Sequence, residues 1–298
     1  MADKERLLID KKYFEEISAY LIKSLRKSRA EIYRLINRTH WRYSDKNLET
    51  ILNIIENSYS EAVTFSTIPT LHKMAAEHYS SAVKQTLKSL KQPSFSWDIR
   101  DENSIRLLNR HDAFFFSKYF TMNQKDTLRK HILEVFESGV PSDELKNRIR
   151  SELNKTAKAS RAYTKSFIDT AGTRARAFAK IQTLDRVDIK RYRISGFRDE
   201  RTCPVCSKLI GKTFEVKDQL EIIKNTFDID YSKPYEEVIL KLQEFSPFVG
   251  YSRTKQKYYT GTKKLGSYRE YEKDDFLKIP GIELVPAHNG CRCSINGA

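Results

Sequence analysis

Apolar side chains recur three or four positions apart through most of the first 184 residues, and this periodicity constrains the fold more than any other feature. Such spacing places the apolar positions on one face of an α-helix. The chain has 10 glycines and 8 prolines in 298 residues, so few turn signals interrupt the pattern. The sequence therefore predicts amphipathic helices over residues 10–37, 47–66, 71–90, 102–121 and 123–138.

Two further helices are predicted between Ser142 and Leu184. Ser142 is a suitable N-cap, and the acidic residues that follow it suit the positive end of the helix dipole. We expect this helix to end near Leu153. A long basic helix is then expected from about Ala157 to Leu184.

The apolar period changes after Asp188. Alternating side chains predict a strand over residues 189–194, and a second strand over 209–216 is followed by a helix near 217–226. Residues 250–272 are rich in Tyr, Lys, Gly and Thr without an apolar period, and predict a basic, mobile loop. We therefore expect an α+β, mainly helical protein, with a helical lobe over 1–155 and a small mixed α+β lobe over 156–298.

Positive charge is concentrated in one stretch of the chain. The formal net charge is +15, and residues 146–198 hold fifteen Lys or Arg against four acids. Such a stretch favours a polyanionic partner, most often nucleic acid, although a solvated helix face is the alternative. In the loop at 250–272, interleaved tyrosines and lysines suit contacts to phosphate and sugar. The alternative is a surface loop whose tyrosines pack on their own lobe. The candidate DNA contacts are Lys158, Arg161, Lys165, Arg174, Arg176, Lys180, Arg191, Arg193, Lys257, Lys263 and Lys264.

All four cysteines lie in the last third of the chain, in two clusters. Cys203 and Cys206 form a CxxC element, and His288, Cys291 and Cys293 form HxxCxC. Cys and His at these spacings suit a closed, four-ligand structural zinc site. We favour Cys203, Cys206, His288 and one of the two distal cysteines, with Cys293 slightly behind; four cysteines without His288 is the second ligand set. The alternative is four thiols without a metal.

Three blocks in this order resemble the phage Mu F-like head morphogenesis proteins. The blocks are 198–206 (RDERTCPVC), 209–214 (LIGKTF) and 285–293 (VPAHNGCRC), and the resemblance extends over about 140–298. The sequence departs from the family pattern at 169–174, where DTAGTR replaces an Arg-Thr-Glu-like element, and in the long gap between the cysteine clusters.

The resemblance implies a non-enzymatic minor head protein of a tailed phage, located at the portal vertex inside the capsid, and in the host cytoplasm during assembly. Its expected partners are double-stranded DNA, the portal protein, and the major capsid or scaffold protein, with a role in head assembly, DNA packaging or DNA ejection. The chain shows no secretory signal and no apolar run that predicts a membrane anchor.

Two other functions remain as alternatives. The first is a portal-binding accessory protein whose basic stretch meets acidic protein instead of DNA. The second is a metal-dependent nuclease or toxin domain that uses the Cys/His site. The sequence contains no glycine-rich phosphate loop, GxSxG element or HExxH element.

Overall fold

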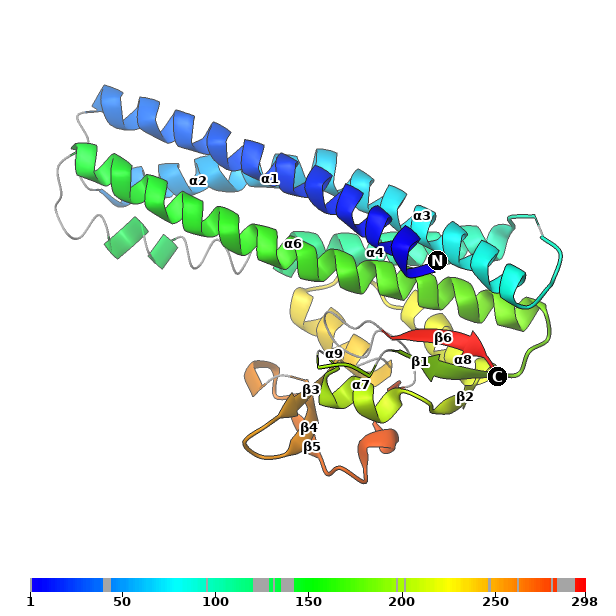
Figure 1. The fold of residues 1–298 in the computed structure, drawn as a ribbon. Helices are drawn as coiled ribbons and strands as arrows, with labels where there is room; N and C mark the ends of the chain where they lie inside the picture. The colour runs from blue at the N-terminus through cyan, green and yellow to red at the C-terminus, as the bar shows by residue number, and fades with distance from the viewer. Residues whose placement is uncertain are drawn as a thin grey trace. The chain divides into compact units, whose positions relative to one another are not determined.

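A computed structural model describes residues 2–39, 44–94, 96–119, 129–130, 132–134, 142–196, 198–200, 202–245, 248–261, 263–279, 281–282 and 293–298. The protein is mainly helical with a small sheet region, as the sequence predicts (Figure 1). The helical elements before residue 190 are α1 (Ala2–Thr39), α2 (Asp45–Ala62), η1 (Val63–Thr67), α3 (Ile68–Ser89), α4 (Ile99–Phe114), η2 (Phe115–Tyr119) and α6 (Ser142–Arg186).

The remaining elements in the described residues form two antiparallel sheets, three α-helices and two short 3-10 helices. The first sheet has the order β2–β1–β6, and the second has the order β3–β4–β5. The elements are β1 (Arg191–Ser195), α7 (Pro204–Leu209), β2 (Thr213–Glu215), α8 (Val216–Phe227), α9 (Tyr235–Phe245), β3 (Val249–Ser252), β4 (Lys257–Thr260), η3 (Lys263–Leu265), β5 (Arg269–Tyr271), η4 (Phe276–Lys278) and β6 (Ser294–Gly297).

The predicted helices at 10–37, 47–66, 71–90, 102–121 and 217–226 and the strand at 189–194 correspond to observed elements. The helix expected at 123–138 lies largely outside the described residues. The predicted break between 153 and 157 is wrong, because α6 continues through it; the segment contains neither Gly nor Pro.

Two predictions for the C-terminal region are corrected: one strand is shorter than expected, and one segment expected to be a loop contains strands. The expected strand over 209–216 shortens to β2, because residues 204–209 form α7. The expected loop at 250–272 contains β3, β4 and β5, with Tyr258 and Thr260 buried on one face of β4. Gly250 lies opposite Tyr259 in this sheet, and a Cβ at Gly250 would lie 2.2 Å from the tyrosine ring, so glycine lets the ring cover the neighbouring strand.

The chain divides into two compact units, each assembled from separate stretches of sequence. Unit 1 contains 1–10, 72–111 and 166–298, and unit 2 contains 11–71 and 112–165. Helices α1, α3, α4 and α6 therefore each contribute to both units. Both units combine residues from distant parts of the chain, and the domain boundary near 155 stays a prediction.

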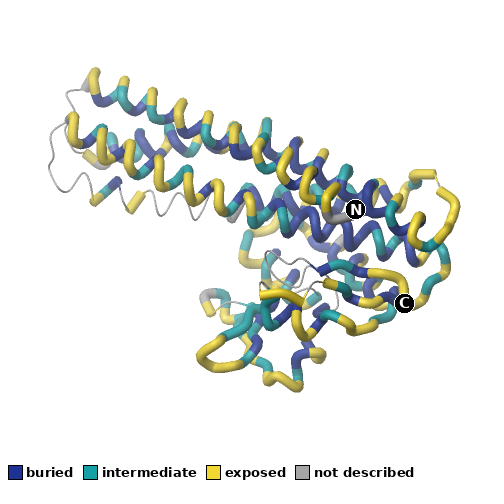
Figure 2. The backbone as a smooth tube through the Cα atoms, in the orientation of Figure 1, coloured by how far each residue is buried: buried dark blue, intermediate teal, exposed yellow. Residues whose placement is uncertain are grey.

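Each unit has its own buried side chains, drawn dark blue in Figure 2. Unit 1 packs α3, α4 and the second half of α6 with both sheets, around a cluster that includes Tyr79, Phe178, Tyr192, Leu209, Tyr258 and Phe276. Unit 2 buries apolar faces of α1, α2 and the first half of α6, including Ile17, Leu21, Ile32, Ile51 and Ile149. Burial of these faces is the main driving force for helix packing.

Candidate metal centre and nucleic-acid interface

The CxxC element lies at the start of α7. Cys203 is the N-cap, and its Sγ accepts a hydrogen bond from the Cys206 backbone N–H at 3.3 Å. Pro204 occupies the first turn, where a missing N–H costs nothing. An amide directed at a sulfur stabilises a thiolate, so this turn suits a metal-ligating cysteine.

Cys293 directly precedes β6 and is buried in the same apolar cluster as Cys206. Its Sγ lies 3.6 Å from the position of a Cβ built on Gly196, just beyond β1. Antiparallel pairing of β1 with β6 brings this distal cysteine into the unit that holds the CxxC turn. The Tyr258 hydroxyl covers the same turn, donating to the Pro204 carbonyl oxygen at 3.3 Å.

The other candidate ligands, His288 and Cys291, lie outside the described residues. Within the described ranges, no group of three or more His, Cys, Asp or Glu side chains is close enough together to hold a metal. Thiolates are common zinc ligands, and Cys206 and Cys293 are buried while Cys203 accepts a backbone N–H, but these three described cysteines do not by themselves converge on one position.

The predicted DNA contacts in unit 2 are solvent-exposed. Lys158, Arg161 and Lys165 project from α6. The Arg161 guanidinium lies 5.0 Å from the centroid of the Phe14 ring and donates to the Glu15 carboxylate at 3.3 Å. Lys158 and Lys165, which form no ion pair with a described residue, remain available to an anionic partner.

The predicted contacts on α6 in unit 1 are used internally. Arg174 is buried and lies 2.9 Å from His111 Nδ1. Arg176 is also buried and donates to Gln85 Oε1 at 2.6 Å. Lys180 donates to Ser294 Oγ at 2.6 Å and to the Ile295 carbonyl oxygen at 2.8 Å. These three cations are therefore poor candidates for the DNA interface, because binding phosphate would require breaking their internal hydrogen bonds.

The candidate contacts after residue 190 differ in their surroundings. Arg191 and Arg193 are exposed on β1, with Arg191 paired to Glu215 at 2.7 Å. Lys257 pairs with Glu272 at 2.6 Å, and the exposed Lys263 lies 5.4 Å from the centroid of the Tyr268 ring. The side chain of Lys264 lies outside the described part of the structure.

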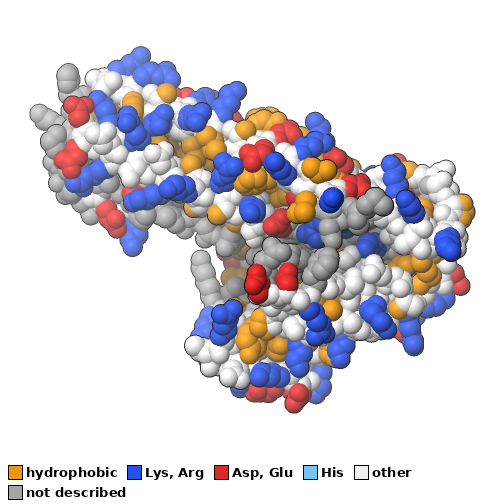
Figure 3. All heavy atoms as spheres, viewed as in Figure 1, with side chains coloured by type: hydrophobic (Ala, Val, Ile, Leu, Met, Phe, Trp, Pro, Cys, Tyr) orange, Lys and Arg blue, Asp and Glu red, His pale blue; other side chains and the backbone are white. Residues whose placement is uncertain are grey.

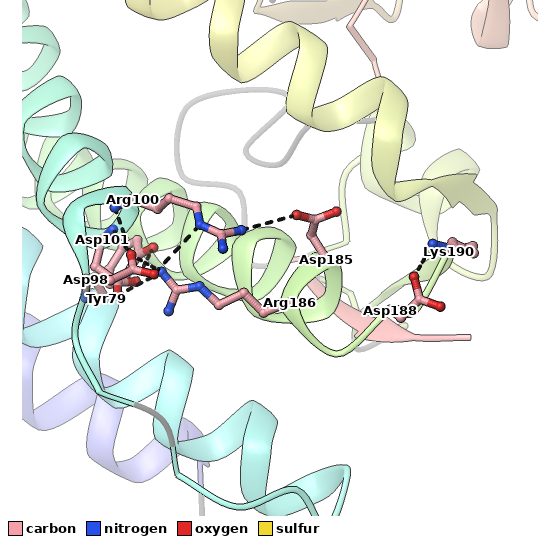
Figure 4. Close-up of polar contacts among 8 residues, drawn as sticks. All are labelled: Tyr79, Asp98, Arg100, Asp101, Asp185, Arg186, Asp188 and Lys190. Carbon is pink, nitrogen blue, oxygen red and sulfur yellow. Dashed lines mark hydrogen bonds and ion pairs between the residues drawn. The ribbon is translucent and has the colours of Figure 1, made fainter.

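Sequence reasoning missed a charged network in unit 1. Arg186 donates to Asp98 at 2.5 Å and to Asp101 at 2.9 Å, and Asp101 accepts the Tyr79 hydroxyl at 3.0 Å (Figure 4). Burial, followed by the Asp101 carboxylate, raises the pKa of Tyr79, so Tyr79 stays a neutral donor. Asp98 directly before a helix was a detectable N-terminal signal. Its partner Arg186, 88 residues away, was not.

Sequence reasoning also missed a cluster of polar side chains around His78, which is fully buried. His78 Nε2 lies 2.9 Å from Asp10 Oδ1. Arg6 lies 3.4 Å from the other Asp10 oxygen and donates to Thr173 Oγ1 at 2.8 Å. A Cβ at Gly172 would lie 2.8 Å from His78 Nε2, so α6 approaches the pair closely because residue 172 is glycine.

Comparison with family models, curated proteins and solved structures finds no match. No helix in the described residues combines the length and apolar character needed to cross a membrane. In the face drawn in Figure 3, Lys and Arg side chains gather over the parts of α1 and α6 that belong to unit 2. The functional interpretation therefore depends on the sequence motifs around the cysteines and on the exposed cations of unit 2.

Proposed function

We propose that this chain is a minor head protein of a tailed bacteriophage that binds double-stranded DNA through its phosphates at the portal vertex. The observation that carries this proposal is the ordered set of blocks at 198–206, 209–214 and 285–293. The exposed cations of α6 in unit 2 support the DNA contact, since a packaged genome presents phosphate whatever its sequence. The proposed role is in head assembly, DNA packaging or DNA ejection, without catalysis.

A structural zinc ion is part of the proposal. Cys203 and Cys206 would supply two ligands, and His288, Cys291 and Cys293 would supply the others. The ion would provide a tetrahedral cross-link between the start of α7 and the segment before β6. That cross-link would join the two ends of the long segment between the two cysteine clusters and stabilise unit 1.

The metal proposal is tested by elemental mass spectrometry on protein purified without added metal. We expect close to one zinc per chain, lost in Cys203→Ser together with a lower melting temperature. The control is Ser207→Ala, at an exposed position of α7, and it should keep the zinc content and the melting temperature of the wild type. Metal-free wild-type protein with the same melting profile as Cys203→Ser would overturn the zinc site.

The DNA proposal is tested by measuring the affinity of the full chain for unrelated duplexes over a range of salt concentrations. Phosphate binding predicts that affinity falls steeply with salt and hardly changes with sequence. Salt-insensitive or strongly sequence-selective binding would contradict it.

Acidic protein is the second candidate partner, because the same exposed cations suit an acidic portal surface. Competition between duplex DNA and purified portal protein separates the two partners. Displacement of this chain from portal by DNA supports the leading proposal. Binding to portal with no binding to DNA favours the accessory role.

A further inference from the structure

We infer that DNA lies along the seam between α1 and α6 in unit 2, an inference that rests on the proposed DNA binding. The seam is defined by cations on both helices, and the two that α1 contributes lie outside the basic stretch at 146–198. Its members are Arg26, Arg29, Arg150, Lys158, Arg161 and Lys165.

Within unit 2 the two helices lie side by side and antiparallel. The Tyr33 hydroxyl donates to the Lys146 carbonyl oxygen at 3.0 Å, near the start of α6. Arg161, further along α6, donates to Glu15 at 3.3 Å. Later residues of α6 therefore contact earlier residues of α1, which makes the two helices antiparallel.

Helical periodicity places the α1 cations in this seam. Glu15 and Tyr33 both contact α6 and are 18 residues apart, which is about five turns. Arg26 and Arg29 fall between them, eleven and fourteen residues after Glu15, so they share its face of the helix. Arg26 is exposed and Arg29 is half-buried.

On α6 the seam cations follow the same rule. Arg150, Lys158, Arg161 and Lys165 are separated by eight, three and four residues, which keeps them on one face. Aromatic rings of α1 hold two of them in place: Arg150 lies 6.0 Å from the Tyr33 ring centroid, and Arg161 lies 5.0 Å from that of Phe14. The guanidinium groups are thus positioned before a ligand arrives.

Charge pairing distinguishes the seam from the neighbouring face of α6. There, Arg148 pairs with Glu144 at 2.5 Å and Lys155 with Glu152 at 2.6 Å. By contrast, four seam cations form no ion pair with any residue that the structure describes. These four are Arg26, Arg29, Lys158 and Lys165. Four uncompensated positive charges therefore lie on the two helix faces that form the seam, and Figure 3 shows Lys and Arg over both helices.

Linear duplex DNA fits this arrangement better than an acidic loop would. Residues 150–165 span about 22 Å of helix axis at about 1.5 Å per residue. Each DNA strand carries a phosphate about every 3.4 Å of its axis and winds once around the duplex in about 34 Å, so the seam faces a few phosphates of each strand. Two parallel rows of cations match a rod of regularly repeated charge.

The test is fluorescence anisotropy of the full chain with a mixed-sequence duplex, over a range of salt concentrations. The seam variant neutralises the four unpaired cations: Arg26→Gln, Arg29→Gln, Lys158→Gln and Lys165→Gln. Affinity should fall about 5-fold for each neutralised cation that binds a phosphate at about 0.15 M salt, and the salt slope should fall by about 0.9 for each such cation.

The matched control removes the same charge from four cations of unit 2 that have acidic partners: Lys27→Gln, Arg129→Gln, Arg148→Gln and Lys155→Gln. Its affinity should stay within about threefold of wild type, because paired cations contribute little to phosphate binding. A second variant that exchanges Lys for Arg and Arg for Lys at the four seam positions keeps the charge and should keep binding.

Three outcomes separate the seam from the proposed function. Equal losses of affinity in the seam and control variants would overturn the seam while leaving DNA binding intact. Absence of DNA binding by the wild-type chain would overturn the proposed function and the seam with it. Binding of polyglutamate that disappears in the seam variant, with DNA binding unchanged, would reassign the seam to an acidic protein.

Discussion

Both halves of α6 are basic, but they use their cations in opposite ways. In unit 2, residues 142–165 present Lys158 and Lys165 to solvent without an ion-pair partner in the described residues. In unit 1, residues 166–186 place Arg174, Arg176 and Arg186 in buried hydrogen bonds or ion pairs. A run of basic residues therefore predicts neither a surface nor a ligand until the acceptors around it are known.

The largest expected effect of a change in α6 is at Arg186. Arg186→Met leaves the buried Asp101 carboxylate without its cation, and breaking a buried pair costs about 3–5 kcal/mol. We expect a drop of that size in the free energy of unfolding, measured by urea denaturation. Arg148→Met removes an exposed pair of unit 2 and should cost less than about 1 kcal/mol. Similar losses of unfolding free energy in the two variants would show that the cations in the two halves of α6 contribute equally to stability.

The next effect is expected at Gly172. Gly172→Ala forces a Cβ to within 2.8 Å of His78, and overpacking costs about 1–3 kcal/mol against a gain of about 1 kcal/mol in helix propensity. We expect a net loss of up to about 2 kcal/mol in the free energy of unfolding, measured by thermal denaturation. The same change in a His78→Ala background should cost less, because the clash is removed. A stabilised single variant would show that α6 has more room there.

A pH-dependent effect is expected from Glu5. Hydrogen bonds from Ser81 and then Gln85 lower the pKa of Glu5 from its usual 4.5. Because the folded pKa is lowered, this stabilisation is present above pH 4.5 and is lost as the pH falls below it. Ser81→Ala should flatten the acid-induced loss of unfolding free energy, whereas Ser89→Ala, in the same helix, should leave it unchanged. Identical acid profiles for wild type and Ser81→Ala would contradict the assignment.

The smallest effect on stability is expected in the exposed half. Lys158→Gln with Lys165→Gln should change the free energy of unfolding by less than about 0.5 kcal/mol, because both side chains are exposed and unpaired within the described residues. The same double variant should weaken DNA binding. Destabilisation comparable to that of Arg186→Met would show that the surface cations also serve the fold.

Much of the helical architecture follows from local pattern. Apolar periodicity located α1, α2, α3 and α4, and the change of period after Asp188 located β1. The break expected near Leu153 failed because polar residues alone do not end a helix. α9 was missed although Val238 and Leu242 are buried at helical spacing, and β4 was missed because its strand is four residues long.

The candidate sites were less accessible to sequence reasoning. The CxxC turn is local, and its place at a helix start follows from Pro204 and the cysteine spacing. The burial of Arg174 and Arg176 depends on His111 and Gln85, which lie 63 and 91 residues away in sequence. The seam between α1 and α6 likewise requires two helices whose pairing no local pattern reveals.

The pairing of β1 with β6 has a consequence for how the chain matures on the ribosome. Ser195 lies opposite Ser294, so β1 emerges about one hundred residues, or roughly 5–20 seconds, before its second partner. Meanwhile β1 can pair with β2 alone, leaving one strand edge open. Lys180 cannot reach its acceptors at Ser294 and Ile295 until that tail is synthesised. The nascent chain therefore carries an open strand edge from the time β2 pairs with β1 until β6 is translated.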